Sequence, residues 1–459
     1  MLCGKYRQKA AEYGRHGYIS ACLRVMEEGQ WQMKIINWLG YWGQLLFLPV
    51  YWLSFLVPGD RRLWLFGSSF GKRFADNPRY LYLYACRHKE RLGIRPVWVT
   101  HNKGIASFLM RNGYEAYYYH SVKGILLALR AKVYFFDNYS KDINFWQSGG
   151  AVKINLWHGT GNKRINYDNR FDKVRHPKNL WEKWKYFPRR LSDEKPSHYV
   201  LASSDMMAGI FARAFRVSRN HVIIDGYPRN DVLLGKFPGM LYTNEEREAV
   251  KRIKRERDAG KKIILYMPTF RQSEAKFFEV MDLEVFSGFL IKNGYVFCTK
   301  LHPKSMLAER FAGVSYPEAI INIMPDVDTY CLLGLADMLA TDYSSVYTDF
   351  LLLDRPTVFF TYDIEEYSRD TRDCYFEYDT YMPEARACDM EGFMAAIKES
   401  FSGNAKTVQY AEGRKKLCAR MWKYTDGRSC LRILRKAAKL AGRKGNSWSI
   451  RDLVTRWRA

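Results

Sequence analysis

Hydrophobic residues along most of the chain fall into short runs rich in β-branched and aromatic residues, and these runs alternate with stretches of helical spacing. The stretches 77–90 and 103–111 have the helical spacing. The strand-like runs of the first half lie at 62–66, 96–100, 114–120, 132–136, 152–157 and 198–202. Strands that alternate with helices predict βαβ units and a parallel sheet.

The alternation begins again after a highly charged segment at residues 244–262. Further strand-like runs lie at 263–267, 295–299, 338–341 and 357–360. Two successive α/β series predict two Rossmann-type domains that face a central cleft, at residues 61–235 and 236–412. We expect an N-terminal region at 1–60 before them and a basic C-terminal helical tail at 413–459 after them.

Three segments are set apart by their composition. Residues 35–57 are apolar and uncharged, about as long as the ~20 residues of a membrane-spanning helix. Pro49 interrupts this segment and its Trp and Tyr residues are spread along it, whereas spanning helices keep them near the ends. This distribution favours a monotopic anchor lying in the plane of an anionic membrane surface, with a spanning helix and a buried core helix as alternatives.

The other two segments are basic. Residues 181–196 are also aromatic and are predicted to form a mobile loop. The tail from residue 413 is rich in Lys and Arg, and it is either the solvated face of a helix or a second contact with a membrane or polymer.

The bulk composition narrows the class of partner. A chain of 459 residues with 47% hydrophobic residues can build the cores of two domains. Its net charge of +25 favours nucleic acid, an acidic membrane surface or phosphorylated substrates. Zinc knuckles, helix-turn-helix signals, RNA-binding motifs and P-loops are absent from the sequence, so we expect no nucleic acid partner and no ATP motor. The nine cysteines are scattered without a C-x-x-C pair, which is typical of reduced cysteines in a cytosolic protein and gives no sign of zinc.

Polar clusters follow four of the predicted strands. Ligands of open parallel sheets bind beyond the carboxyl ends of the strands, so these positions are where a site is expected. The clusters are His158, Gly159, Thr160, Gly161, Lys163 and Arg164; Thr269 and Arg271; Lys300, His302 and Lys304; and Asp342, Ser344, Ser345 and Asp349. Each cluster has a structural alternative, since Asp342 or Ser344 can cap a helix that starts at Ser345, and Arg271 can pair with a nearby carboxylate.

Taken together, the four clusters suit phosphate chemistry. The cations and the start of a helix at Ser345 can hold a pyrophosphate. A histidine can take a proton from an attacking hydroxyl near neutral pH, which is the expected role of His158. His302 can hydrogen-bond the phosphoryl group, and the glycines allow the backbone to approach a substrate. The cations can do the work of a metal, so we expect neither a metal nor a cofactor.

A second motif offers a competing interpretation. Residues 67–71 match the G-x-S-x-G elbow of esterases, and His158-Gly159 loosely matches an oxyanion motif. The oxyanion motif of an esterase should precede the elbow, and a helix should follow the serine at once, whereas residues 72–78 look like a loop. In the two-domain interpretation Ser68 and Ser69 lie on the acceptor side of the cleft.

The quoted motifs resemble one known family. WHGTGNKR at 157–164, YMPTFR at 266–271, KLHP at 300–303 and the long stretch TDYSSVYTDFLLLDRPTVFFTYDIEEY at 341–367 are similar to the CDP-glycerol glycerophosphotransferases of teichoic-acid and capsule synthesis. The segment LWLFGSSFGKRFADNPRYLYLY at 63–84 is similar to the family too. The resemblance covers roughly residues 62–382.

The resemblance implies a GT-B-like fold and the transfer of an alditol phosphate from a CDP-alditol to a hydroxyl of a glycan or lipid-linked polymer, with release of CMP. It implies a peripheral protein on the cytoplasmic face of the membrane. His158 falls on the family's proposed base and His302 on a histidine at the donor phosphates. The positions that fall on the donor side are Thr269, Arg271, Ser344, Ser345 and Asp349. A nucleotide-sugar glycosyltransferase and a non-catalytic polymer- or membrane-binding protein remain alternatives.

The chain differs from the usual sequence of the family at two places. Family members often have Pro-Leu where this chain has Gly161-Asn162, and a Pro-Gly-Pro turn near the Met382-Pro383-Glu384-Ala385 of this chain. Both changes predict a difference on the acceptor side, and the sequence does not decide between glycerol and ribitol donors or between priming and polymerisation.

Overall fold

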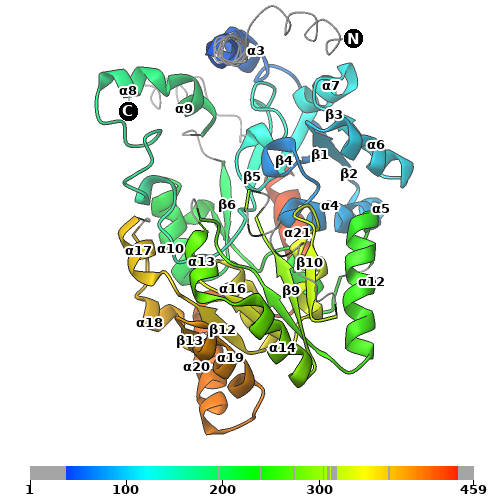
Figure 1. The fold of residues 1–459 in the computed structure, drawn as a ribbon. Helices are drawn as coiled ribbons and strands as arrows, with labels where there is room; N and C mark the ends of the chain where they lie inside the picture. Colours follow the sequence, from blue (N-terminus) through cyan, green and yellow to red (C-terminus); the bar gives the residue numbers. More distant parts are fainter. Residues whose placement is uncertain are drawn as a thin grey trace, which may run out of the picture.

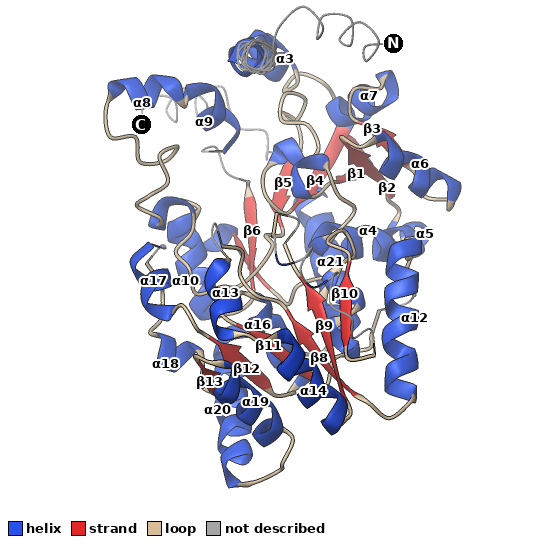
Figure 2. Ribbon diagram, in the orientation of Figure 1, coloured by secondary structure: helices blue, strands red, loops and turns tan. Residues whose placement is uncertain are grey.

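The structure, a computed structural model, describes residues 38–442 apart from 194–196, 238, 272–273, 303, 306, 308–310, 312–317 and 371–372. Residues 35–37 of the predicted membrane segment, Pro303, and residues 443–459 of the basic tail therefore lie outside the described residues. Within the described part, parallel strands form two separate sheets, each with helices around it (Figures 1 and 2).

The first sheet has seven strands in the order β3-β2-β1-β4-β5-β6-β7, and every pairing is parallel. Its strands are β1 (Asp60–Phe66), β2 (Arg95–Thr100), β3 (Ala116–Tyr118), β4 (Ala131–Phe136), β5 (Val152–Asn155), β6 (Tyr199–Ala202) and β7 (Val222–Ile224). The helices that cover it are α4 (Asp76–Arg87), α5 (Lys89–Leu92), α6 (Lys103–Arg111), α7 (Val122–Arg130), α10 (Asp205–Ala214) and α11 (Asn230–Leu233). Because helices cover both faces, most residues of the central strands are buried on both sides of the sheet, including Lys153 and Asn155 of β5.

The second sheet has six parallel strands in the order β10-β9-β8-β11-β12-β13. They are β8 (Lys262–Tyr266), β9 (Tyr295–Lys300), β10 (Ile320–Ile323), β11 (Met338–Thr341), β12 (Thr357–Phe360) and β13 (Ala385–Ala387). The surrounding helices include α12 (Asn244–Asp258), α13 (Ala275–Val280), α14 (Leu283–Asn293), α16 (Val346–Phe350), α17 (Ile364–Asp370), α18 (Tyr378–Tyr381), α19 (Met390–Ser400) and α20 (Ala405–Met421). The predicted α/β class with parallel sheets is confirmed.

Three differences from the predicted elements have a physical reason. Strands β7, β10 and β13 were not predicted: β7 and β13 have only three residues each, and the polar Asn322 interrupts the four residues of β10. The charged segment 244–262 is mostly the helix α12, which a Thr243–Glu246 capping box starts and a buried stripe of Val250 and Ile253 holds in place. The prediction of a loop at residues 181–196 is wrong for the described part, which forms α8 (Leu180–Lys185) and α9 (Phe187–Asp193).

The C-terminal helix α21 (Ser429–Gly442) returns to the first sheet, where it lies beside α4 (Figure 1). It buries one face, which includes Cys430, Ile433, Leu434, Ala437 and Leu440, against this half of the molecule. The basic residues lie on the other face, so the described part of the tail is an amphipathic helix rather than a detached arm.

Residues 38–43 are helical and continue into a 3-10 turn (Gln44–Phe47) and the helix α3 (Leu48–Leu53). Within residues 38–442 as described, no helix combines the length and the apolar character needed to cross a membrane. Several large apolar side chains of this segment are exposed, including Leu46 at 82% and Leu56 at 75%.

Candidate active site

One cavity of about 420 Å³ collects the residues that follow strands of both sheets. Its size falls in the range of small-molecule sites, roughly 300–1,000 Å³. From the first half come Arg73, Trp157, His158, Gly159, Gly161, Asn162 and Lys163; from the second come Thr269, Phe270, Lys300, His302, Tyr343, Ser344, Ser345 and Tyr375. Both predicted histidines, His158 and His302, line this cavity. This agrees with the rule that ligands bind at the carboxyl ends of parallel strands.

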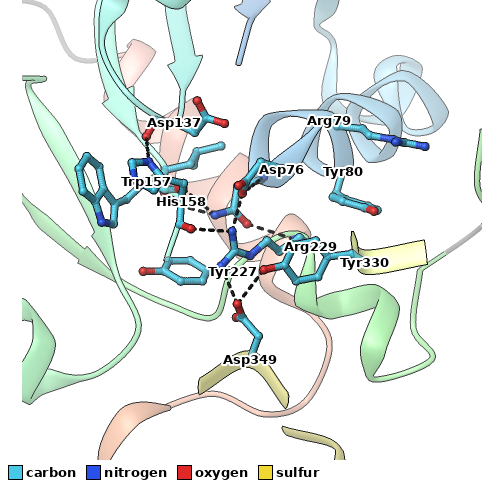
Figure 3. A network of polar contacts seen from close by, with 12 residues as sticks. Asp76, Arg79, Tyr80, Asp137, Trp157, His158, Tyr227, Arg229, Tyr330 and Asp349 are labelled. Carbon is cyan, nitrogen blue, oxygen red and sulfur yellow. Dashed lines mark hydrogen bonds and ion pairs between the residues drawn. The ribbon is translucent and has the colours of Figure 1, made fainter. Parts of the chain in front are cut away.

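The ring of His158 is fixed in one tautomer. Its Nδ1 lies 2.9 Å from the backbone carbonyl oxygen of Asp137, the residue that follows β4 (Figure 3). A carbonyl oxygen only accepts, so Nδ1 carries the hydrogen and Nε2 keeps a free lone pair. The side chain is exposed to the cavity, whereas its other sides face protein, and this desolvation lowers the pKa of His158. The ring is thus held neutral, with a proton acceptor at Nε2.

His302 has the opposite tautomer. The backbone N–H of Lys304 donates to its Nδ1 at 3.2 Å, so the hydrogen of the neutral ring is on Nε2. Desolvation and the nearby Lys304, Lys300 and Arg73 lower its pKa. Its ring packs against Phe270, with the two ring centroids 4.8 Å apart. His302 therefore offers an N–H donor where His158 offers an acceptor.

Two cations at the cavity are held by the same backbone turn. Lys300 is 8% exposed, and its Nζ donates to the carbonyl oxygen of Pro325 at 2.7 Å. Arg73 contacts the carbonyl oxygens of Pro325 and Asp326 at 3.3 and 3.2 Å. Burial, with a further contribution from Arg73, lowers the pKa of Lys300 to about 8. Neither cation is neutralised by a carboxylate among these contacts, so both keep charge for an anion.

Ser344 and Ser345 line the cavity just before α16. The helix begins at Val346, one residue after the expected start, ends at Phe350 and continues as a 3-10 turn over Leu351–Leu353. Ser345 lies against the glycines of the His158 loop in the first half of the molecule. A Cβ at Gly161 would lie 3.1 Å from the Cβ of Ser345, and one at Gly159 would lie 3.1 Å from its Oγ. The glycines thus let the loop approach Ser345.

Eight residues of the predicted clusters and serine loop are not among those that line the cavity: Thr160, Arg164, Arg271, Asp349, Asp342, Lys304, Ser68 and Ser69. Arg271 is paired with the carboxylates of Asp342 and Asp363 and donates to the carbonyl oxygen of Thr269 at 2.7 Å. Asp349 is fully buried. Thr160 is also fully buried, and Arg164 donates to backbone carbonyl oxygens of residues 373 and 374. Arg271 therefore pairs with nearby carboxylates, as its structural alternative predicted.

The remaining predicted cavity residues are Thr269 and Lys163. The backbone N–H of Thr269 donates to both carboxylate oxygens of Asp342, at 2.8 and 3.0 Å, which fixes the turn after β8. The Nζ of Lys163 lies 4.7 Å from the ring centroid of Tyr367. Both residues line the cavity, one from each half.

The serine loop after β1 is a rigid structural feature. Ser68 is fully buried and donates to the carbonyl oxygen of Arg73 at 3.0 Å. Ser69 and Phe70 both have a left-handed backbone, with φ of 51° and 55°. Their N–H groups donate to the buried carboxylates of Asp137 and Asp142, at 2.9 and 3.0 Å. Burial raises the pKa of both carboxyls, that of Asp142 to about 6. No esterase-type helix follows Ser69, since α4 begins only at Asp76.

The unusual Asn162 joins the two halves. Its side chain is 4% exposed and makes two hydrogen bonds with the backbone of Phe376, at 2.7 and 2.8 Å, and its carbonyl oxygen accepts from the N–H of Tyr375 at 2.7 Å. The hydroxyl of Tyr375 in turn donates to Asp168 at 2.9 Å. The second departure from the family's wording, Glu384, is also buried and pairs with Arg414 at 2.6 Å. The side chains of Asn162 and Glu384 thus make buried polar contacts, while Gly161 and Asn162 also line the cavity.

Sequence reasoning missed two charged residues near the site, Arg73 and Arg229. Arg73 lies in the loop after β1, and only Ser68 and Ser69 of this loop were predicted as site residues. Arg229 lies five residues after β7, so recognising that short strand would have identified it. Across the described parts of the chain, no three His, Cys, Asp or Glu side chains are grouped to hold a metal ion.

Comparison with known proteins identifies a family that the chain matches. The family model described as CDP-glycerol:poly(glycerophosphate) glycerophosphotransferase matches residues 50–439. A teichoic acid glycerol-phosphate transferase of Staphylococcus aureus is 26% identical over 385 residues, which are 82% of this chain and 92% of the relative. A teichoic acid poly(glycerol phosphate) polymerase of Bacillus spizizenii is 29% identical over 354 residues, 75% of this chain and 85% of the relative.

A solved structure of the wall teichoic acid polymerase TagF superposes with a TM-score of 0.65 at 24% identity, covering 83% of this chain and 90% of that chain. At 24% sequence identity, this structural similarity shows that the two proteins share a fold. A teichoic acid ribitol-phosphate polymerase of S. aureus is also similar, 27% identical over 242 residues, 52% of this chain and 40% of the relative.

Proposed function

Since the chain belongs to the CDP-glycerol:poly(glycerophosphate) glycerophosphotransferase family, and is an enzyme of that family, we propose that it transfers glycerol phosphate from CDP-glycerol to a hydroxyl group of a glycan or lipid-linked polymer and releases CMP. Glycerol is the first choice of alditol because relatives described as glycerol-phosphate enzymes cover more of the chain than the ribitol-phosphate relative. The product is a phosphate-linked polymer of the teichoic-acid or capsule type.

The proposed reaction is a displacement at phosphorus. The acceptor hydroxyl oxygen attacks the phosphorus that carries glycerol, and a new P–O bond forms. The bond from this phosphorus to the bridging oxygen of the pyrophosphate breaks, and the bridging oxygen leaves with CMP. The hydroxyl proton goes to Nε2 of His158, the unprotonated ring nitrogen of a side chain that lines the cavity.

The observation that carries the proposal is the pair of opposite tautomers in one cavity. A hydroxyl nucleophile needs an acceptor for its proton, and His158 has one at Nε2. A phosphoryl oxygen that gains negative charge needs a donor, and His302 has one at Nε2. Because each tautomer is fixed by a backbone group that can act in only one way, the two rings cannot exchange roles without breaking a hydrogen bond.

The charges around the cavity fit the leaving group. Lys300 lines the cavity from the second half and Arg73 lines it from the first half. The hydrogen bonds described above for both side chains go to backbone carbonyl oxygens and not to carboxylates. The hydroxyls of Ser344 and Ser345 add donors without charge. We assign these four residues to the donor pyrophosphate, and the glycine-rich loop with Lys163 to the acceptor side.

A donor panel tests the proposed function. The purified protein is incubated with a glycan or lipid-linked acceptor and with CDP-glycerol, CDP-ribitol or a UDP-sugar, and the released nucleotide is measured. The proposal expects CMP with CDP-glycerol. CMP with CDP-ribitol alone would move the assignment to ribitol, UDP release would favour the glycosyltransferase, and no nucleotide release with any donor would overturn the proposal.

We also propose that the enzyme binds the cytoplasmic face of the membrane through an apolar surface made by the N-terminal segment and α8. The exposed side chains of this N-terminal apolar surface are Trp38, Leu39, Leu46, Phe47, Leu53, Leu56, Leu180, Trp181 and Trp184. The two parts are joined by the rings of Trp42 and Trp184, whose centroids lie 4.3 Å apart, and by a 2.9 Å hydrogen bond from the hydroxyl of Tyr41 to the carbonyl oxygen of Lys185. The exposed Lys183 and Lys185 beside them suit anionic lipid.

Vesicle flotation tests this location. We expect the protein to float with vesicles that contain phosphatidylglycerol and the double variant Leu180→Asp/Trp181→Asp to remain at the bottom of the gradient. The matched control is Val408→Asp, since Val408 is 56% exposed on α20 at the opposite end of the molecule (Figure 1). Equal flotation of both variants would refute the role of this surface.

A further inference from the structure

Arg229 is a buried arginine at the junction of the two halves. It is 2% exposed and lies in the loop after β7. Its guanidinium contacts the carboxylate of Asp76 at 2.7 Å, the backbone carbonyl oxygen of His158 at 2.9 Å and the carboxylate of Asp349 at 2.7 Å (Figure 3). The first two partners belong to the first half and Asp349 belongs to α16 of the second. One side chain therefore joins the loop of His158 to the helix that follows the donor serines.

The backbone around His158 is strained and needs such support. Trp157 has a left-handed backbone with φ of 53°, which is unfavourable for a bulky residue. Its carbonyl oxygen accepts from the side-chain amide of Asn77 at 2.8 Å, and the next carbonyl oxygen, that of His158, accepts from Arg229. Asn77 also accepts from the backbone N–H of Arg229 at 3.3 Å. Two consecutive carbonyl groups are thus fixed by one connected network.

The other arm of the network reaches the donor side. The carboxylate of Asp349 accepts from Arg229, from the amide of Asn230 at 2.9 Å and from the hydroxyl of Tyr330 at 2.7 Å. Asp349 is fully buried and lies four residues after Ser345, one turn along the chain. Its contacts leave the carboxylate no path to a ligand in the cavity, and they fix α16 relative to the loop of His158.

We propose that Arg229 is a positioning residue, which holds the His158 loop and the Ser344–Ser345 segment at the separation that the transfer reaction requires. This role rests on the proposed function, in which His158 takes the acceptor proton and the serines hold the donor. It gives Asp349 a part in positioning, as the anchor of Arg229, in place of direct contact with the donor.

Arg229 also affects the pKa of His158. Desolvation lowers the pKa of His158, Asp76 raises it, and Arg229 lowers it. The charged groups that act on the pKa of the ring are Asp76 from α4 and Arg229 from the loop after β7, and the other titratable side chains that line the cavity are Arg73, Lys163, Lys300 and His302. A change at Asp76 or Arg229 should therefore move the acidic limb of the rate profile in a predictable direction.

The first test compares Arg229→Lys with Arg79→Lys. Arg79 is a matched control because it is also fully buried and also joins the halves, through a two-fold contact with Glu246 at 2.5 and 2.8 Å, but it does not contact the His158 loop. We expect Arg229→Lys to lower kcat about ten- to hundred-fold with the KM for CDP-glycerol within about two-fold, because a small displacement of a base costs this much. Arg79→Lys should lower the melting temperature without that loss of kcat per folded enzyme.

The second test uses Asp76→Asn, which removes charge at a partly exposed position and keeps the size of the side chain. We expect the acidic limb of kcat/KM to move to lower pH, since Asp76 raises the pKa of His158. An unmoved limb together with equal kcat for Arg229→Lys and Arg79→Lys would overturn the positioning role. If Arg229→Lys does not fold, the kcat of Asp76→Asn decides, because this variant weakens one of the three contacts that hold Arg229, and an unchanged kcat would overturn the positioning role. Donor turnover by the wild type is measured in parallel, so failure of the proposed function is seen separately.

Discussion

The titration of Lys300 gives a quantitative prediction. Burial lowers its pKa to about 8, so its charge is lost as the pH rises through 8. With this value the side chain is roughly 90% protonated at pH 7 and roughly 10% protonated at pH 9. If donor capture needs the charge, kcat/KM for CDP-glycerol falls about ten-fold between these pH values, which corresponds to about 1.4 kcal/mol.

The assay is the initial rate of CMP release at CDP-glycerol concentrations well below KM, from pH 5.5 to 9.5. The free enzyme's groups appear in kcat/KM, so the profile should be bell-shaped. Its basic limb reports Lys300 near pH 8. Its acidic limb reports His158 and lies at a lower pH than an ordinary histidine would give, since desolvation lowers the pKa of that ring and the base must be unprotonated.

The control is Lys300→Arg, because a guanidinium keeps its charge throughout this range. The basic limb near pH 8 should disappear in this variant even if its kcat/KM is lower at every pH. Lys153, whose pKa burial also lowers to about 8, is common to both proteins, so their difference isolates Lys300. A wild-type profile that stays flat to pH 9, or a variant that keeps the same limb, would refute the role of Lys300.

Two further predictions concern the junction of the halves. Gly161→Ala should lower kcat about ten-fold with little change in melting temperature, because its Cβ would lie 3.1 Å from the Cβ of Ser345 and displace the loop, whereas Gly209→Ala, with nothing within 4 Å, should behave as wild type in the same rate assay. Arg271→Met should destabilise the fold by about 3–5 kcal/mol in urea denaturation, since it leaves buried carboxylates without their partner. The double variant Arg271→Met/Asp363→Asn should recover part of that loss; a stable single variant with a raised donor KM would instead favour direct donor contact.

The sequence was informative where a local pattern determines the outcome. Hydrophobic runs of four or more residues identified strands of both sheets, and the parallel order of the strands places their polar carboxyl ends at the same edge of each sheet. His158 and His302 were found in this way, although 144 residues separate them along the chain (302 − 158 = 144). The rule needs only strand ends and no knowledge of side-chain contacts.

The sequence could not identify partners that come from distant elements. Arg271 and Asp349 were placed at the donor, but their carboxylate and guanidinium partners lie 71–120 residues away, from Asp342 (342 − 271 = 71) to Arg229 (349 − 229 = 120). Similarly, Asn162 was expected to change the acceptor side, and it does line the cavity, but its hydrogen bonds to the backbone of Phe376 could not be identified from the sequence. Such pairings depend on three-dimensional proximity, which hydrophobic periodicity does not encode.

The central claim is that this enzyme moves glycerol phosphate, rather than a sugar, onto an acceptor hydroxyl, with His158 as the base. The most direct measurement is mass spectrometry of a defined acceptor after incubation with CDP-glycerol, with CMP counted in the same samples. We expect the acceptor to gain one glycerol phosphate for each CMP released, and His158→Ala to lower this rate by about 10²–10⁴-fold while still binding CDP-glycerol. An unchanged acceptor mass in the presence of CMP, or near-wild-type transfer by His158→Ala, would contradict it.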